Sequence, residues 1–472
     1  MKQYKRLWVI LAIIMIGSFT LLGYFGKEVY NERPPIPTAF VDQHGKVIYS
    51  EADIYAGQSA WQGIGGMSVG SVWGHGAYQA PDWTADWIHR EVLGWLDQQA
   101  QRQFGKPYAE LAERDKATLN YDSKGAFRTN TYNPENGQVT LSDDRIRSIQ
   151  AVAAYYDKLF GDDPSMHTLR EKYAMKENTL ADPEARRQMN AFYFWSAWAA
   201  STNRPGTDVT YTNNWPHEPL IGNEPTPENV IWSIASVVML IFGVGFIIWV
   251  WAFFTHQQHI EVEAPAADPL SLVKLTPSQK SLGKYLLVVA ALFLVQALLG
   301  GATAHYTVEG QEFYGIPLAD WLPYSLTRTW HIQASIFWIA TGFLAAGLFL
   351  VPIINGGKDP KFQKLGVDVL FWALIAVVVC SFAGQFIAVK GWMAPSLNWW
   401  FGHQGYEFVE IGRVWQIALF IGLVLWLYLM LRGIWAALRA PGDKSLLILF
   451  TMGAAAIGIF YAPALIYGEH TH

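Results

Sequence analysis

Seven long apolar stretches run along the chain, and each is close to the roughly 20 residues that cross a bilayer as an α-helix. They lie at about 7–24, 230–254, 285–299, 332–353, 367–389, 414–430 and 446–467. The first follows a basic segment and has no evident cleavage site of small residues, so we interpret it as an uncleaved anchor rather than a signal peptide. The pattern predicts a mainly α fold, a polytopic membrane helix bundle.

The segment 27–229 has the patterns of a folded domain rather than of a linker. Two short apolar runs within 39–50, separated by a polar stretch, predict a hairpin that turns at His44-Gly45. Three helices are predicted from their capping residues, at 84–104, 142–160 and 185–201. The expected domains are an anchor at 1–26, an external domain at 27–229 and a membrane domain at 230–472.

Basic residues are distributed unevenly over the short loops. Lysines and arginines follow the second, fourth and sixth apolar stretches, whereas the loops 303–327 and 391–412 contain none. By the positive-inside rule the N-terminus is cytoplasmic, and 27–229 is periplasmic or extracellular. We therefore expect a protein of the cell (inner) membrane, surrounded by lipid.

Composition supports this class and excludes several kinds of site. Of the 472 residues, 51% are hydrophobic and only 15% are charged, well below the usual share in soluble proteins. We expect no nucleic acid partner. The single cysteine, Cys380, lies in an apolar stretch, where we expect it in the core. One cysteine excludes internal disulfides, a cysteine zinc site, an iron–sulfur cluster and a haem c attached through Cys-x-x-Cys-His.

A histidine beside the fourth apolar stretch is the strongest candidate for chemistry. His331 is costly to carry into a membrane span unless something coordinates it or hydrogen-bonds to it. A neutral imidazole is a common axial ligand of haem iron. A hydrogen bond to a neighbouring helix would satisfy the ring equally well, and the spacing alone leaves both interpretations open.

The third apolar stretch leads into a second candidate site. His305 and Glu309 are four residues apart and share a face if the helix continues, and Phe313 extends that face by one turn. A His–carboxylate pair beside an aromatic ring suits a quinol head group, because the polar groups can accept its hydroxyl protons. The alternative is an interfacial polar pair with no ligand.

Three charged residues precede the sixth stretch. Glu407, Glu410 and Arg413 are spaced three apart, so they lie near one face of a helix. The carboxylates can bind a hard cation such as calcium. The arginine can hold a haem propionate, and the alternative is a local Glu–Arg salt bridge.

In the external domain, the glycines of Gly74-His-Gly76-Ala-Tyr78 allow the backbone to approach another surface closely. An ordinary turn explains this segment equally well.

Taken together, these segments resemble the quinol-dependent nitric oxide reductases of the haem-copper oxidase superfamily, over essentially the whole chain. Cytochrome c-dependent relatives carry a Gly-x-Gly-Ala-Tyr-x-Ala-Pro segment after Cys-x-x-Cys-His in a separate subunit. Here that segment is 74–81, fused to the membrane domain, and 57–66 lacks the cysteines. The segment 213–223 is similar to the family's linker. The resemblance implies a subunit I-like bundle with an external cytochrome c-like domain that lacks haem c.

The resemblance also implies roles for the candidate residues. His331 matches an axial ligand of the low-spin haem b. A calcium site would involve Gly76, Tyr78 and Glu407, with Glu410 close by, and a quinol pocket would involve His305, Glu309 and Phe313. Arg413 remains either a haem propionate partner or part of a local salt bridge.

The implied cofactors are haem b, haem b3, a non-haem iron and calcium. The implied reaction joins two molecules of nitric oxide into nitrous oxide and water. Electrons come from membrane quinol, no cytochrome c subunit is required, and a homodimer is allowed.

The family's binuclear iron centre and the second haem b ligand belong to later helices. We therefore expect 230–472 to be the first six helices of a truncated bundle, with no catalytic residues of that centre and no activity on its own. Two rival hypotheses are an oxygen-reducing haem-copper quinol oxidase and a non-enzymatic membrane receptor with an external sensing domain.

Overall fold

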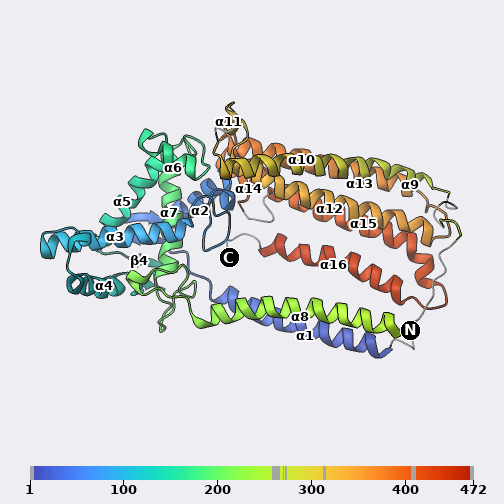
Figure 1. Cartoon of the computed structure of the whole chain (residues 1–472), viewed down its shortest axis with the longest axis horizontal. Coiled ribbons are helices and arrows are strands. Elements are labelled where there is room, and N and C mark those ends of the chain that lie inside the picture. Colours follow the sequence, from blue (N-terminus) through green and yellow to red (C-terminus); the bar gives the residue numbers. More distant parts are fainter. Residues whose placement is uncertain are drawn as a thin grey trace.

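A computed structural model describes residues 5–257, 266–268, 271, 274–311, 315–405 and 411–467. Long helices run lengthwise through one part of the molecule, and a smaller mixed part caps one end (Figure 1). In the capping part the elements are β1 (Ala39–Val41), β2 (Val47–Ser50), α2 (Glu51–Gly63), η1 (Gly66–Ser68), α3 (Trp83–Phe104), η2 (Tyr108–Glu110), α4 (Glu113–Arg128), β3 (Tyr132–Asn133), β4 (Gln138–Thr140), α5 (Asp143–Phe160), η3 (Pro164–Met166), α6 (His167–Lys172), α7 (Pro183–Ser201) and η4 (Pro219–Ile221).

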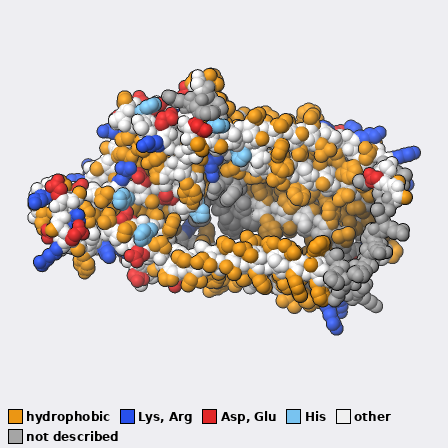
Figure 2. All heavy atoms as spheres, viewed as in Figure 1, with side chains coloured by type: hydrophobic (Ala, Val, Ile, Leu, Met, Phe, Trp, Pro, Cys, Tyr) orange, Lys and Arg blue, Asp and Glu red, His pale blue; other side chains and the backbone are white. Residues whose placement is uncertain are grey.

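The seven predicted spans are confirmed as helices long and apolar enough to cross a membrane. They are α1 (Lys5–Asn31), α8 (Pro227–Gln257), α10 (Gly283–Val308), α12 (Tyr324–Ile354), α13 (Gln363–Val389), α15 (Arg413–Arg439) and α16 (Ser445–Tyr467). Short helices α9 (Pro277–Ser281), α11 (Leu318–Trp321) and α14 (Pro395–Phe401) lie between them. Apolar side chains cover most of the visible surface of this part (Figure 2). The chain is an integral membrane protein.

Close helix contacts make α10, α12, α13 and α15 into one block. α10 lies along α12, and α15 packs against α12, α13 and α16. A Cβ added to Gly433 of α15 would lie 1.9 Å from Val351 Cγ1, so only glycine permits this approach. Cys380 of α13 is exposed, which corrects the expectation that it lies in the core.

The capping part, residues 32–226, is called the external domain here after its predicted location, and it confirms the predicted hairpin and adds to it. β1 pairs antiparallel with β2 and also parallel with β4, in the sheet order β2-β1-β4-β3. The predicted helices are α3, α5 and α7, with Gly105 in the left-handed region behind α3 and Ser142 capping α5. The helices α2 and α4 were not predicted. α4 has no side-chain cap, and its buried stripe of Leu119, Ser123 and Phe127 is only partly apolar.

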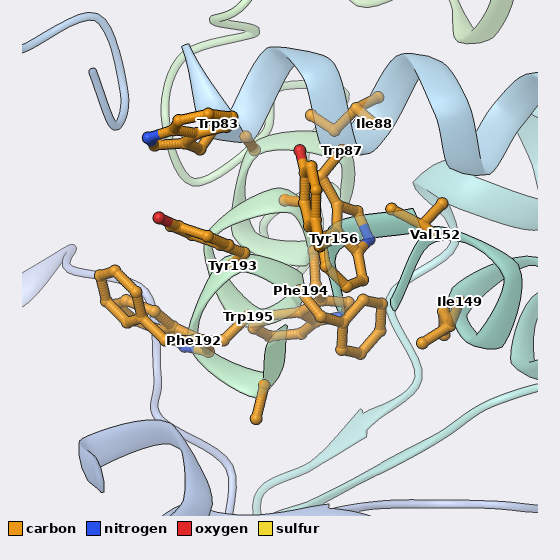
Figure 3. Packing of buried hydrophobic residues seen from close by; sticks show 14 of the residues in the cluster. Trp83, Trp87, Ile88, Ile149, Val152, Tyr156, Phe192, Tyr193, Phe194 and Trp195 are labelled. Carbon is orange, nitrogen blue, oxygen red and sulfur yellow. The ribbon is translucent and has the colours of Figure 1, made fainter. Parts of the chain in front are cut away.

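Aromatic rings fill the interior of the external domain. Residues 189–201 of α7 are all buried. Trp87 of α3 meets Phe194 of α7 and Tyr156 of α5 (Figure 3). Trp83 stacks on Tyr193 with ring centroids 5.8 Å apart. Large rings bury much apolar area each and dominate the energetics of such a core.

A buried ion pair crosses this core. Arg145 Nε donates to Glu91 Oε1 at 2.9 Å, and both side chains are almost fully buried. Trp87 Nε1 donates to the other carboxylate oxygen, and the guanidinium lies over the ring of Phe127. Each charge is therefore tolerated only because the other is present.

Replacing Glu91 by Gln should leave the Arg145 charge buried without its counterion. We expect the external domain to lose about 3 kcal/mol of stability, seen as a lower apparent Tm of the purified protein. Glu113→Gln is the control, because Glu113 pairs with Lys116 at the surface and should change little. Equal Tm values for Glu91→Gln and the parent would contradict this account.

Candidate functional site

His331 lies at the α10–α12 interface and is hydrogen-bonded through one ring nitrogen. Its Nδ1 lies 2.8 Å from the backbone carbonyl oxygen of Gln296 on α10. A carbonyl oxygen only accepts, so Nδ1 carries the proton and Nε2 keeps its lone pair. A neutral ring held in this tautomer by a carbonyl is the usual form of a metal-binding histidine.

Small residues on α10 make room for the imidazole. A Cβ added to Gly300 would lie 2.7 Å from Cε1 of His331. One turn earlier, Gln296 Oε1 accepts a hydrogen bond from Trp338 Nε1 at 2.6 Å. The side chain and the carbonyl of Gln296 thus both bind α12, which fixes the register of the two helices around the ring.

These features fit a haem b iron with His331 as one axial ligand. The hydrogen bond to Gln296 is also the neighbouring-helix contact that the alternative interpretation requires, and it is compatible with ligation through Nε2. Within the described residues, no group of three or more His, Cys, Asp or Glu side chains could hold a metal ion. Among the described residues, His331 is therefore the candidate for a haem ligand.

The His305–Glu309 pair ends α10, as the spacing predicts. His305 Nδ1 and Glu309 Oε2 are 2.9 Å apart, and both side chains are about two-fifths exposed (42% and 39%). Glu309 is the C-cap, and its N–H donates to the carbonyl oxygen of His305. The pair is thus preformed and accessible at the end of a membrane span. Phe313 lies outside the described residues.

The proposed calcium ligands are only partly placed. Glu407 and Glu410 lie outside the described residues. Gly76 has φ 134°, and an added Cβ would lie 2.7 Å from the carbonyl oxygen of Met67. Met67 N–H in turn donates to the carbonyl oxygen of Gly405 at 2.9 Å. Gly76 and Gly405, which precedes Glu407 by two residues, therefore both contact the short helix η1.

The side chain of Tyr78 does not join this contact. Its ring is 78% exposed, and its hydroxyl donates to the carbonyl oxygen of Gly74 at 2.9 Å. Any role for Tyr78 near a cation would fall to its backbone.

Arg413 is buried at the start of α15. Its guanidinium donates to the carbonyl oxygen of Leu465 at 2.8 Å and lies 4.6 Å from the centre of the Trp399 ring. The arginine is thus held between α14 and α16. The salt-bridge alternative involves Glu410 and so falls outside the described residues.

His403 is a buried polar residue to which sequence reasoning assigned no role. Its Nδ1 accepts a hydrogen bond from the N–H of Gly405 at 2.8 Å, so Nε2 carries the proton and donates to Thr329 Oγ1 at 3.0 Å. The Thr329 hydroxyl is bonded to Ser68 Oγ of the external domain. This chain of bonds joins the two domains two residues from His331. The only sequence signal for this contact is the position of His403 in the segment Gly402-His-Gln-Gly405.

Burial lowers the pKa of His403 to about 3, so the ring is neutral in the folded protein at ordinary pH. An unfolded histidine has a pKa near 6.5. The stabilisation is therefore complete above pH 6.5 and is lost progressively as the pH falls from 6.5 toward 3, where the unfolded state binds the proton first.

We expect the loss to reach about 2 kcal/mol at pH 5. His403→Gln should remove this part of the pH dependence of the apparent Tm between pH 6.5 and 5. His44→Gln, at an exposed position, should retain the slope of the parent. Parallel curves for the parent and His403→Gln would show that the ring is not buried as a neutral base.

Two protein families match this chain. Residues 280–472 match the family described as Cytochrome C and Quinol oxidase polypeptide I, and residues 37–217 match the cytochrome c-like domain of the nitric oxide reductase protein NorB. A search of curated proteins found no match. The first of these matches defines the class, an oxidoreductase of the haem-copper type that uses haem and metal cofactors. The chain belongs to the haem-copper oxidase superfamily, as a NorB-like member.

Proposed function

We propose that this chain is a quinol-dependent nitric oxide reductase and that it carries the site of quinol oxidation. The observation that carries the proposal is that one helix serves two candidate sites. α10 holds His331 through Gln296 and packs on its ring at Gly300, and it presents His305 and Glu309 at its end. At about 1.5 Å per residue, Gly300 and His305 are roughly 8 Å apart along the axis. A quinol at the helix end would thus lie close to the haem ligand.

The His–Glu pair supports quinol oxidation by the protons it can take. When Nδ1 of His305 donates to Glu309, Nε2 is the unprotonated ring nitrogen and can accept a proton from a quinol hydroxyl. The carboxylate can accept the second proton. Quinol then leaves as quinone after giving up two protons and two electrons, which are the numbers consumed when two molecules of nitric oxide form nitrous oxide and water.

Haem b bound at His331 would supply the one-electron acceptor for this oxidation. In the proposed enzyme the electrons continue to haem b3 and a non-haem iron. The external domain supports a quinol rather than a cytochrome c donor, because the matched segment 37–217 contains no cysteine and its interior is filled by aromatic side chains. No haem c would be attached there.

The proposal extends to the membrane arrangement. The domains are an anchor at 1–26, an external domain at 27–229 and a membrane domain at 230–472, with the N-terminus in the cytoplasm. Basic residues in the loops after α12 and α15 support this orientation. The protein would lie in the inner membrane and is compatible with a homodimer.

The haem assignment is tested on the protein expressed from its own gene and purified in detergent. We expect the reduced-minus-oxidised spectrum to show b-type haem. His331→Ala should remove part of this haem signal, and His217→Ala should leave the signal unchanged. Decylubiquinol should support consumption of nitric oxide. Fast oxygen consumption with slow nitric oxide consumption would favour the oxidase hypothesis, and a protein without haem would favour the receptor hypothesis.

The proposed calcium site consists of Gly76, Tyr78 and Glu407, with Glu410 close by, and Tyr78 would take part through its backbone. A ligand that binds only the folded state raises its stability in proportion to the logarithm of its affinity. We expect EGTA to lower the apparent Tm by several degrees, calcium but not magnesium to restore it, and Glu407→Gln to abolish the response. An unchanged Tm in EGTA would remove calcium from the proposal.

A further inference from the structure

A segment of the external domain binds the chain directly after α10, the helix that carries the proposed quinol site. Residues 171–176, here called the docking segment, begin at the end of α6. Gln311 N–H donates to Glu171 Oε2 at 3.2 Å, and its side-chain amide donates to the carbonyl oxygen of Met175 at 2.8 Å. Gln311 is buried by these contacts. The first described residues after α10 are therefore held by the external domain.

The position of this contact relative to Glu309 is fixed by one glycine. Gly310 adopts φ 93°, a conformation that reverses the chain directly after the C-cap. A Cβ added there would lie 3.3 Å from Glu171 Oε2. The carboxylate of Glu171 thus lies against the residue that separates Glu309 from Gln311.

The same segment is anchored at a second helix end. Lys176 Nζ donates to the carbonyl oxygen of Val389, the last residue of α13, at 3.1 Å. A cation at a helix C-terminus satisfies carbonyls that have no partner within the helix. Between the two charged residues, Ala174 belongs to a buried cluster with Ala77, Tyr306 and Tyr324. The docking segment therefore has a defined seat on α10, α12 and α13.

We propose that Glu171 is a positioning residue of the quinol site and that the external domain completes this site. Glu171 fixes the position of Gln311. Because only Gly310 separates Gln311 from Glu309, this also fixes the backbone at Glu309 and keeps its carboxylate beside His305. This inference rests on the proposed function of the His305–Glu309 pair. It gives the external domain a role in quinol binding that needs no haem of its own.

The surroundings of Glu171 make it suitable for substitution. A cavity of about 450 Å³ lies beside it, lined also by Gln311, Lys176 and Asp320. Asp320 is exposed and Glu171 is partly exposed, so water can replace the lost carboxylate. Removing it should free the backbone N–H of Gln311 without leaving a buried charge.

The experiment measures how tightly decylubiquinone binds to the purified protein, expressed from its own gene, by quenching of tryptophan fluorescence. Glu171→Ala should raise the Kd at least fivefold, with an unchanged haem spectrum and apparent Tm. Glu171→Gln should restore part of the affinity, because its amide oxygen still accepts from Gln311 N–H. Glu135→Ala, at an exposed position outside the docking segment, should bind like the parent.

A second measurement separates positioning from a general effect on folding. In a Glu309→Gln background, Glu171→Ala should weaken binding no further, because Glu171 acts through Glu309. Equal binding by Glu171→Ala and the parent, or additive losses in the double variant, would overturn the positioning role. If Glu171→Ala does not fold, Glu171→Gln and its double variant decide the question in the same way. A parent that binds no decylubiquinone would instead overturn the proposed function.

Discussion

The hydrogen bond from His331 Nδ1 to the carbonyl oxygen of Gln296 is the interaction on which the membrane part depends. An imidazole within a span must have a partner, and the choice of partner decides which nitrogen remains basic. Here the Gln296 carbonyl of α10 accepts the hydrogen bond from Nδ1, so Nε2 is the ring nitrogen that remains basic. The same turn of α10 also accepts from Trp338. Helix register, ring orientation and tautomer are thus set together.

The external domain is joined to this frame by polar contacts that have little freedom. On one side, neutral His403 links Thr329 and the loop at Gly405, with Ser68 bonded to Thr329. On the other side, Glu171 and Lys176 each satisfy a backbone group at the end of a span. Charged groups are used where water is near, and an uncharged ring is used where burial is complete. This division follows the cost of burying charge.

Much of this arrangement could be predicted from the sequence. The apolar stretches predicted all seven spans because a bilayer imposes length and composition directly. The pairing of His305 with Glu309 followed from helical spacing, and the helices α3, α5 and α7 followed from their capping residues. Such predictions need only neighbours along the chain.

What could not be predicted depends on residues distant in sequence. The parallel pairing of β1 with β4 joins strands about a hundred residues apart, and nothing in the sequence near either strand indicates the other. The partner of His331 is a carbonyl, which every residue possesses, so no side chain signals it. His403 and Glu171 look like ordinary loop residues until the two domains are placed together. Tyr78 illustrates the reverse case, because its motif suggested a close contact while its ring lies at the surface.

The seam between the domains includes a contact of backbone with backbone. A Cβ added to Gly66 would lie 2.2 Å from the Cα of Gly405, so the two segments cannot slide or swing past each other without separating. Many electron-transfer proteins use a tethered head that travels between donor and acceptor. A domain clamped at this seam keeps one position relative to the helices, and it is therefore built unlike such a travelling head.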